Sequence, residues 1–269
     1  MAPDSASLPL VSIVTPSFNS DRFIEATVES VLRQDYPSVE HIVVDGCSTD
    51  RTLEILSAYP HLHVVSEPDK GQTDALIKGF GLARGKIFAW LNSDDFYYPG
   101  AIASAVEVLE ATGAALVYGS CDVIDESGEL RETRSALPYD FQQELEWGSK
   151  IMQPPAFFTR AAFESCGGLD PEVSFAMDYD LWLKLGKRFP VERIDRVVAA
   201  FRVTCGQRSM HPDAMPEVRR IARRHGAPFL SWRYLHRMEM RRPRLARQLY
   251  RVRRLLDLVR APMARRGAR

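Results

Sequence analysis

Long apolar runs are missing from this sequence, although 45% of its 269 residues are hydrophobic. No such run reaches 18 residues, whereas a helix that crosses a bilayer needs about 20. We therefore expect no transmembrane helix. Residues 1–9 also lack a basic stretch followed by an apolar one, which predicts that no signal peptide is present. The hydrophobic fraction suffices for the core of one large α/β domain or two small ones.

Cysteine is equally scarce. The four cysteines, Cys47, Cys121, Cys166 and Cys205, are widely separated and match no metal-binding spacing. We therefore expect reduced thiols and a cytoplasmic location. No internal repeat or low-complexity stretch precedes the basic C-terminal part of the chain.

The formal net charge of the chain is zero, but acidic and basic residues are unevenly distributed along it. Residues 1–216 hold 18 Lys and Arg against 32 Asp and Glu, a charge of −14, whereas residues 217–269 hold 17 Arg against 3 acids, a charge of +14. This division predicts a domain over residues 1–216 and an Arg-rich helical extension over residues 217–269. Such a basic extension is typical of segments that meet an anionic surface.

Short β-rich runs alternate with helical patterns in the first hundred residues. The expected strands are residues 10–15, 41–44, 62–65 and 87–91, with helices that begin near residues 20, 50 and 72. This alternation is typical of βαβ units and predicts an α/β fold with a mostly parallel central sheet flanked by helices. The sequence further predicts helices over 99–111 and 160–166, a hairpin over 115–134, and strands within 153–159 and over 191–201.

Polar residues follow the expected strands directly. Asn19, Asp45 and the doublet Asp94-Asp95 each come just after a strand end. Ligands of parallel sheets bind beyond the carboxyl ends of the strands, so one crevice is expected to collect these side chains.

The doublet Asp94-Asp95 has two interpretations. It is either a solvated acidic turn before the next helix or a site for Mg²⁺ or Mn²⁺, because adjacent carboxylates are costly to bury without a cation or hydrogen-bond donors. Mg²⁺ is usually held by one or two carboxylates together with substrate phosphates.

Asp178 also has two interpretations, since it precedes an amphipathic helix that contains Leu181, Trp182 and Leu185. It is either an N-cap, which stabilises a helix by about 1 kcal/mol, or a general base at the rim of the crevice. Spacing alone favours the cap. Asp180 then lies in the first turn, where the helix dipole favours an acid.

Five ordered motifs resemble the inverting family 2 glycosyltransferases, which have a GT-A-type fold. The resemblance covers about residues 9–210 and rests on residues 14–19 (Val-Thr-Pro-Ser-Phe-Asn), 43–52 (Val-Val-Asp-Gly-Cys-Ser-Thr-Asp-Arg-Thr), 66–71 (Ser-Glu-Pro-Asp-Lys-Gly), 91–95 (Leu-Asn-Ser-Asp-Asp) and 177–182 (Met-Asp-Tyr-Asp-Leu-Trp). One doublet is a weak signal, whereas five motifs in the family's order and spacing are a strong one.

The resemblance implies a nucleoside-diphosphate sugar as donor. It places the nucleotide against Pro16, Asn19 and Asp45, turns Asp94 toward the ribose and makes Asp95 the ligand of a divalent cation. It also makes Asp178 the catalytic base, which overturns the preference for a cap.

Cationic side chains are expected to stabilise the diphosphate leaving group. Lys70, Arg208 and His211 are the candidates, with an ordinary surface position as the alternative for each. The sequence also departs from the family pattern at two positions. Gly46 stands where many members have a second acid that reads the nucleobase, and Met177 stands where many have Glu before the base, which predicts a base without a carboxylate neighbour.

Two rival functions use similar residues. A nucleotidyltransferase is expected to have a Gly/Arg-rich phosphate loop near its N-terminus, and residues 14–19 contain neither Gly nor Arg. A non-catalytic nucleotide-sugar binding module explains the sheet and the acidic turns but not the places of both Asp95 and Asp178.

The basic extension contains a predicted amphipathic helix over residues 244–260. Five apolar residues recur there at spacings of 4, 3, 4 and 3, opposite a basic face. This pattern predicts an interfacial helix on an anionic membrane surface, with packing on the acidic domain as the alternative. No nucleic-acid motif is present. The hypothesis is a cytoplasmic enzyme held peripherally at the inner membrane, which adds a sugar to a glycan or lipid-linked acceptor.

Overall fold

Nine strands form one sheet in the computed structural model, which describes residues 8–205, 207, 211–228 and 249. The strands are β1 Val11–Ser17, β2 Val39–Asp45, β3 His63–Ser66, β4 Ile87–Trp90, β5 Phe96–Tyr97, β6 Leu116–Ile124, β7 Leu130–Arg134, β8 Ala156–Thr159 and β9 Val191–Arg202. The helices are α1 Ile24–Leu32, α2 Thr52–Ser57, α3 Gln72–Leu82, α4 Ala101–Thr112, α5 Phe141–Trp147, α6 Arg160–Ser165, α7 Met177–Gly186 and α8 Ala214–Arg224.

The first four strands form the parallel part of the sheet, in the order β3-β2-β1-β4. β1 and β4 are buried along their whole length, and β4 is accordingly a continuous apolar run in the sequence. Helix α3 packs closely on β1 at Gly79, where an added Cβ would lie only 2.3 Å from Val14 Cγ1. The carboxyl ends of β1, β2 and β4 therefore meet at one edge, as the sequence predicts.

The second half of the sheet is largely antiparallel. β8 pairs antiparallel with both β4 and β6, β5 pairs antiparallel with β9, and β7 folds back on β6, while β6 and β9 are parallel. The predicted α/β fold with a central sheet and flanking helices is confirmed. Taken as a whole, the sheet is mixed, with one parallel half and one largely antiparallel half. Strand β5 was not predicted, because two residues carry no periodicity.

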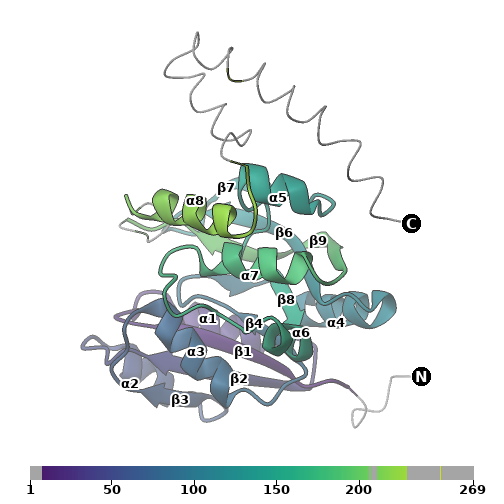
Figure 1. Cartoon of the computed structure of the whole chain (residues 1–269). Coiled ribbons are helices and arrows are strands. Elements are labelled where there is room, and N and C mark those ends of the chain that lie inside the picture. Colours follow the sequence, from purple (N-terminus) through teal and green to yellow (C-terminus); the bar gives the residue numbers. More distant parts are fainter. Residues whose placement is uncertain (1–7, 206, 208–210, 229–248, 250–269) are drawn as a thin grey trace.

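Helices cover both faces of the sheet (Figure 1). α3, α6 and α7 contribute to one apolar cluster, and α1 and α4 contribute to another. Trp90 of β4 stacks on Trp182 of α7, with ring centroids 5.7 Å apart and an interplanar angle of 12°. This contact fixes the middle of α7 relative to the end of β4.

Two helices begin later than the sequence predicts. α1 begins at Ile24 rather than near residue 20, because the Ser20 hydroxyl bonds the hydroxyl of Ser93 at 2.8 Å instead of capping the helix. α4 begins at Ala101, after Gly100 in the left-handed conformation. Pro99 is therefore outside the helix rather than in its first turn.

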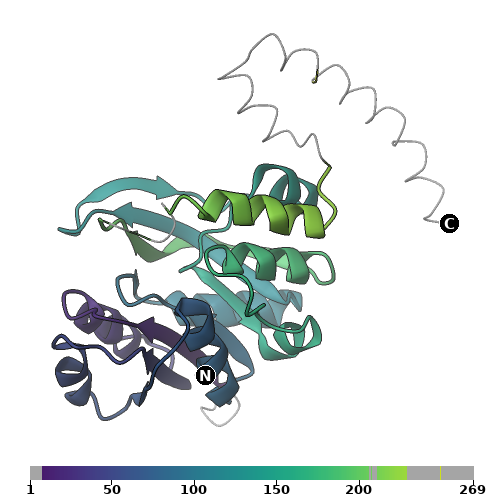
Figure 2. The same cartoon turned by 60° about the vertical axis from the view of Figure 1, so that its left-hand side comes forward.

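Helix α8 spans the predicted boundary at residue 216 and packs against α7, on the outside of the molecule (Figure 2). The division of the chain into residues 1–216 and 217–269 stays a prediction. Residues 244–260 lie outside the described residues, apart from position 249. Among the described helices, none has the length and apolar character needed to cross a membrane.

Candidate active site

A cleft of about 740 Å³ lies at the carboxyl ends of the parallel strands. Four of the predicted site residues line it: Pro16, Asn19, Asp94 and Asp178. Asp45 and Asp95 are buried behind the lining residues, with 0% and 1% of their surface exposed. Lys70 is exposed and is not part of the lining, and Arg208 lies outside the described residues.

Asn19 joins the loops that follow β1 and β2. It adopts the left-handed conformation with φ 50°, which Asn tolerates better than most residues. Its backbone N–H donates to Ser48 Oγ at 2.8 Å, and its Oδ1 accepts from the Thr49 N–H at 2.9 Å. The side chain therefore shapes the rim of the cleft.

Asp45, the last residue of β2, accepts hydrogen bonds from residues at the same edge of the sheet. Its Oδ2 accepts from the Ser48 N–H and from Ser66 Oγ, both at 2.9 Å, and its Oδ1 accepts from Ser48 Oγ. The carboxylate thereby joins the loops after β2 and β3. A direct contact of Asp45 with a nucleotide stays a prediction.

The doublet Asp94-Asp95 lies in the loop between β4 and β5, with its two carboxylates at different depths. Asp95 Oδ1 accepts from the Arg202 N–H at 2.9 Å, and Oδ2 accepts from Asn92 Nδ2 at 3.2 Å. Burial, followed by the charge of Asp94, raises the pKa of Asp95 well above its usual range, and burial also raises the pKa of Asp94. The site is therefore short of positive charge.

Arg202, the last residue of β9, is a cationic residue that contacts this doublet. It was not among the site residues predicted from the sequence. Its Nε donates to the Asp94 carbonyl at 3.0 Å, and its guanidinium lies 4.6 Å from the ring centroid of Phe23. Only 7% of its surface is exposed. A lone Arg at a strand end belongs to no motif, so no local signal identifies it.

The doublet provides carboxylate oxygens of the kind that divalent cations prefer. Within the described ranges no group of three or more His, Cys, Asp or Glu side chains forms a complete metal cage. Mg²⁺ does not require one, because it usually takes one or two carboxylates and completes its shell with water and phosphate oxygens. Two hard oxygen donors with raised pKa values match that chemistry.

Asp178 lies in the first turn of α7 and faces the cleft. The N-cap of this helix is Ala176, so the interpretation of Asp178 as an ordinary N-cap is wrong. Its Oδ1 accepts from the Tyr179 N–H at 2.7 Å. Burial, with a smaller contribution from the Glu217 charge, raises the pKa of Asp178 to about 6. A carboxylate with this pKa is a suitable general base near neutral pH.

Two acidic residues from distant parts of the chain interact with the charge of Asp178. The charge of Glu217 in α8 raises the pKa of Asp178. Burial raises the pKa of Glu144 in α5 to about 7, with a smaller contribution from the charge of Asp178. The expectation, drawn from Met177, that the base lacks a carboxylate neighbour stays a prediction, since these are effects of charge rather than contacts.

Glu217 also holds the loop that leads into α7. Its Oε1 accepts from the N–H groups of Phe175 and Ala176 at 2.6 and 2.9 Å, and its Oε2 accepts from the Ser174 N–H at 3.0 Å. The residue is 9% exposed. Helix α8 is anchored a second time by Arg224 Nη2 and His225 Nε2, which lie 2.6 and 2.9 Å from Asp180 Oδ1 in the first turn of α7.

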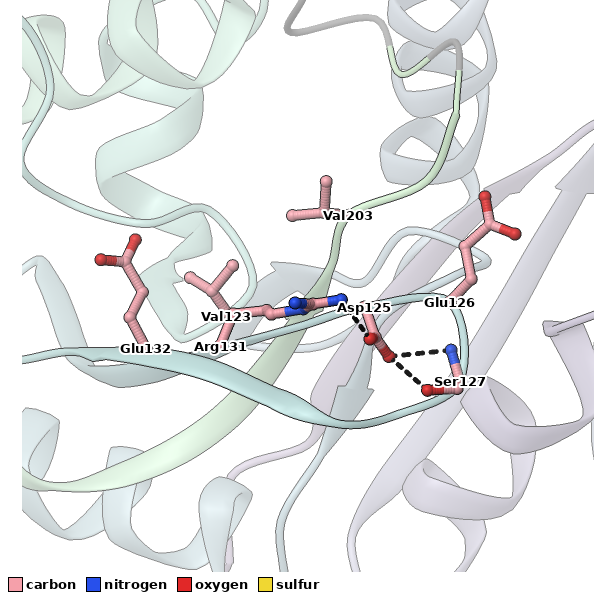
Figure 3. A pocket seen from close by; sticks show the side chains of 7 residues that line it. All are labelled: Val123, Asp125, Glu126, Ser127, Arg131, Glu132 and Val203. Atoms are coloured by element: carbon pink, nitrogen blue, oxygen red, sulfur yellow. Dashed lines mark hydrogen bonds and ion pairs between the residues drawn. The ribbon is translucent and has the colours of Figure 1, made fainter.

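A second pocket, of about 670 Å³, lies on the β6–β7 hairpin (Figure 3). Its charged groups are largely engaged with their own neighbours, since Asp125 accepts from Ser127 and pairs with Arg131 at 2.7 Å. Glu126 connects it to the main cleft, where its carboxylate accepts from Arg22 and from the Cys205 N–H, each at 2.9 Å.

Comparison with known proteins identifies the family. The family model described as glycosyl transferase family 2 matches residues 12–166. An uncharacterized glycosyltransferase of Mycobacterium tuberculosis is 32% identical over 182 residues, which cover 66% of this chain and 69% of that protein. This chain therefore belongs to glycosyl transferase family 2.

Among named relatives, the chondroitin synthase of Escherichia coli is 32% identical over 202 residues, which cover 72% of this chain. The match spans 29% of the synthase, so this chain corresponds to under a third of that relative.

Solved structures confirm the GT-A-type fold. S. aureus TarS 1-349 in complex with UDP-GlcNAc superposes with a TM-score of 0.62 at 18% identity, over 79% of this chain and 65% of that one. The mannosyltransferase PcManGT from Pyrobaculum calidifontis, in complex with GDP-Man and Mn2+, gives a TM-score of 0.61 at 22% identity, over 96% of this chain and 83% of that one.

Proposed function

We propose that this chain transfers a sugar from a nucleoside-diphosphate sugar to an acceptor hydroxyl, with inversion at the anomeric carbon and with the help of a divalent cation. The observation that carries the proposal is one cleft lined by both Asp94, in the loop after β4, and Asp178, in the first turn of α7, with Asp95 buried next to Asp94. The donors of two structural neighbours, UDP-GlcNAc and GDP-Man, are nucleotide sugars and support this class of substrate.

Asp178 serves as the general base in this proposal. With a pKa near 6 it is ionised at neutral pH and can still take the proton of a hydroxyl as that oxygen attacks the anomeric carbon. Attack from the face opposite the leaving diphosphate requires one base and no covalent nucleophile, and gives inversion. The cleft contributes mainly by holding the two substrates in line.

Asp95 is the proposed cation ligand, with Asp94 beside it on the cleft surface. A bound cation would offset the charge that develops on the diphosphate as the sugar–phosphate bond breaks. Lys70 and Arg208 stay candidates for contacts with the diphosphate. His211, the third cationic candidate, stacks on Phe175 of the cleft wall with ring centroids 4.6 Å apart.

The acceptor is proposed to be a glycan or a lipid-linked sugar, as part of surface polysaccharide or glycolipid synthesis. The relative named chondroitin synthase supports a polysaccharide context. No nucleic acid is involved in this proposal.

A panel of nucleotide sugars tests the proposed function. The purified chain is expected to release a nucleoside diphosphate slowly from one donor when Mg²⁺ or Mn²⁺ is present, and to stop when a chelator is added. Binding without release would favour a non-catalytic binding module. Transfer of the nucleotide itself would favour a nucleotidyltransferase.

Glu217→Gln is expected to lower kcat about tenfold while the donor KM changes less than about twofold. Gln keeps one oxygen for the N–H groups of Phe175 and Ala176, but its amide N–H₂ then faces the Ser174 N–H. In the wild type the negative charge of Glu217 raises the pKa of Asp178. The variant lacks this charge, so the acid limb of the pH–rate profile should move to lower pH.

Steady-state kinetics over a pH series measures both effects. Glu107→Gln, on the exposed side of α4, is the matched control. If kcat and the acid limb of the pH–rate profile are both unchanged in Glu217→Gln, Glu217 of α8 does not influence the base Asp178.

We also propose that the basic extension, including residues 244–260, attaches the enzyme to the cytoplasmic face of the inner membrane. Each basic residue near an anionic leaflet contributes on the order of 1 kcal/mol. Full-length protein should therefore float with anionic liposomes at low salt and be released at high salt. A chain that ends at Pro228 should stay at the bottom of the gradient.

The truncation at Pro228 keeps α8 and its contacts with α7, which a cut at Pro216 would remove. Equal flotation of the two proteins would contradict a membrane role of the extension. Packing of the extension on the acidic domain would then be favoured.

A further inference from the structure

The strand order gives the cleft a direction. The doublet Asp94-Asp95 follows β4, whereas Gly46 follows β2 and Asp69 follows β3, at the other end of the order β3-β2-β1-β4. Gly46 and Asp69 both line the cleft. If the proposed function holds, a nucleotide whose diphosphate lies beside the doublet extends its base toward these two residues.

The lack of a side chain at Gly46 lets a carboxylate and a ring approach its backbone closely. A Cβ at this position would lie 2.7 Å from Asp69 Oδ2 and 3.5 Å from Phe18 Cδ2. Phe18 lines the cleft, and 63% of its surface is exposed. A nucleobase presents a flat apolar face and a hydrogen-bonding edge, and Phe18 and Asp69 offer the complement of each.

The Asp69 carboxylate is fixed in this position. Its Oδ1 accepts from the Gly71 N–H at 2.7 Å, and Gly71 has a φ of 111°, which favours glycine. Oδ2 is the atom that lies toward Gly46. Asp45, by contrast, is fully buried and both of its oxygens accept hydrogen bonds from Ser48 or Ser66.

We propose that Asp69 determines the nucleobase, by accepting the ring N–H of uracil (N3) or guanine (N1) at the end of the cleft lined by Phe18, Gly46 and Asp69. Cytosine N3 and adenine N1 are acceptors at the corresponding ring position, so their lone pairs repel the carboxylate. Asp69 thereby takes the place of the second acid whose position is occupied by Gly46. This selectivity rests on the proposed use of a nucleotide donor.

Calorimetric titration of the full chain with UDP, GDP, CDP and ADP, each with Mn²⁺, tests the proposal without any acceptor. Either UDP or GDP should bind at least about tenfold more tightly than CDP and ADP, since one hydrogen bond to a charged group is lost and a repulsion is gained. Asp69→Asn should reduce that ratio to about threefold or less, because an amide presents N–H as well as oxygen.

Two further variants keep the test specific. Gly46→Ala, whose added Cβ displaces the Asp69 carboxylate, should weaken the preferred nucleotide by a similar factor. Asp195→Asn, on the exposed surface of β9 and outside the cleft lining, should leave all four affinities unchanged. Circular dichroism confirms that each variant is folded.

The outcomes separate this inference from the proposed function. Binding of all four nucleotides with similar affinity, or a preference that survives Asp69→Asn, overturns the role of Asp69 alone. Failure of every nucleoside diphosphate to bind overturns the nucleotide donor as well.

Discussion

Asp178→Asn is expected to lower kcat by about 10²- to 10⁴-fold while donor affinity changes by less than about threefold. The Asn oxygen can still accept from the Tyr179 N–H, so the first turn of α7 keeps its geometry. The amide cannot take a proton from the acceptor hydroxyl. The loss should therefore fall on the chemical step and not on donor binding.

The pH dependence of the wild type provides a second test of Asp178. Burial raises its pKa to about 6, so the active, ionised form is lost as the pH falls through that value. We expect kcat/KM to fall below about pH 6 and to be level above it, until another group titrates. The residual activity of Asp178→Asn should lack this acid limb.

Asp195→Asn is the matched control for Asp178→Asn. Asp195 is on β9 with 78% of its side chain exposed, and it pairs with Arg193 at the surface. Full activity of Asp178→Asn, or a loss of equal size in the Asp195 variant, would contradict the assignment of the base.

Asp95→Asn is expected to abolish cation-dependent turnover and to weaken donor binding by about tenfold or more. Asn can still accept from the Arg202 N–H, so the contact between β9 and the doublet survives the change. What is lost is a negative charge that a divalent cation would neutralise. Thermal unfolding should move little, because the substitution is isosteric.

Electron paramagnetic resonance of Mn²⁺ in the presence of a nucleoside diphosphate measures cation binding independently of turnover. Asp95→Asn should release the ion, and Asp122→Asn, whose carboxylate bonds Tyr98 and Thr133 instead, should not. Asp94→Asn is compared in parallel, because Asp94 is the member of the doublet that lines the cleft. Retention of Mn²⁺ by the Asp95 variant and its loss from the Asp94 variant would move the ligand to Asp94.

The parallel half of the fold could be predicted because its signals are local. β1, β2 and β4 are short, largely buried strands. β2 ends in Asp45, and Asn19 and Asp94 follow β1 and β4 within a few residues. The antiparallel half could not be predicted in the same way. The pairing of β8 with β4 and β6 joins segments far apart in the sequence, and the two residues of β5 are too few to show a period.

The candidate site divides along the same line. Asp94, Asp95 and Asp178 belong to ordered motifs, so the sequence identifies them. Arg202 and Glu217 act on these residues through contacts that span 107 and about 40 positions, respectively, and neither lies in a motif. Sequence spacing also suggested a cap role for Asp178, because a first-turn acid and an N-cap differ by only two positions.

Proton NMR of the sugar released from the nucleotide donor, with water as the acceptor, tests the central claim most directly. The full chain is incubated with Mg²⁺ and without Mn²⁺. The first anomer of the released sugar should have the configuration opposite to that of the donor, before mutarotation mixes the two forms. Release should stop in a chelator and in Asp178→Asn. A first anomer that matches the donor, or no cation-dependent release from any nucleotide sugar, would contradict an inverting glycosyltransferase that uses Asp178 as its base.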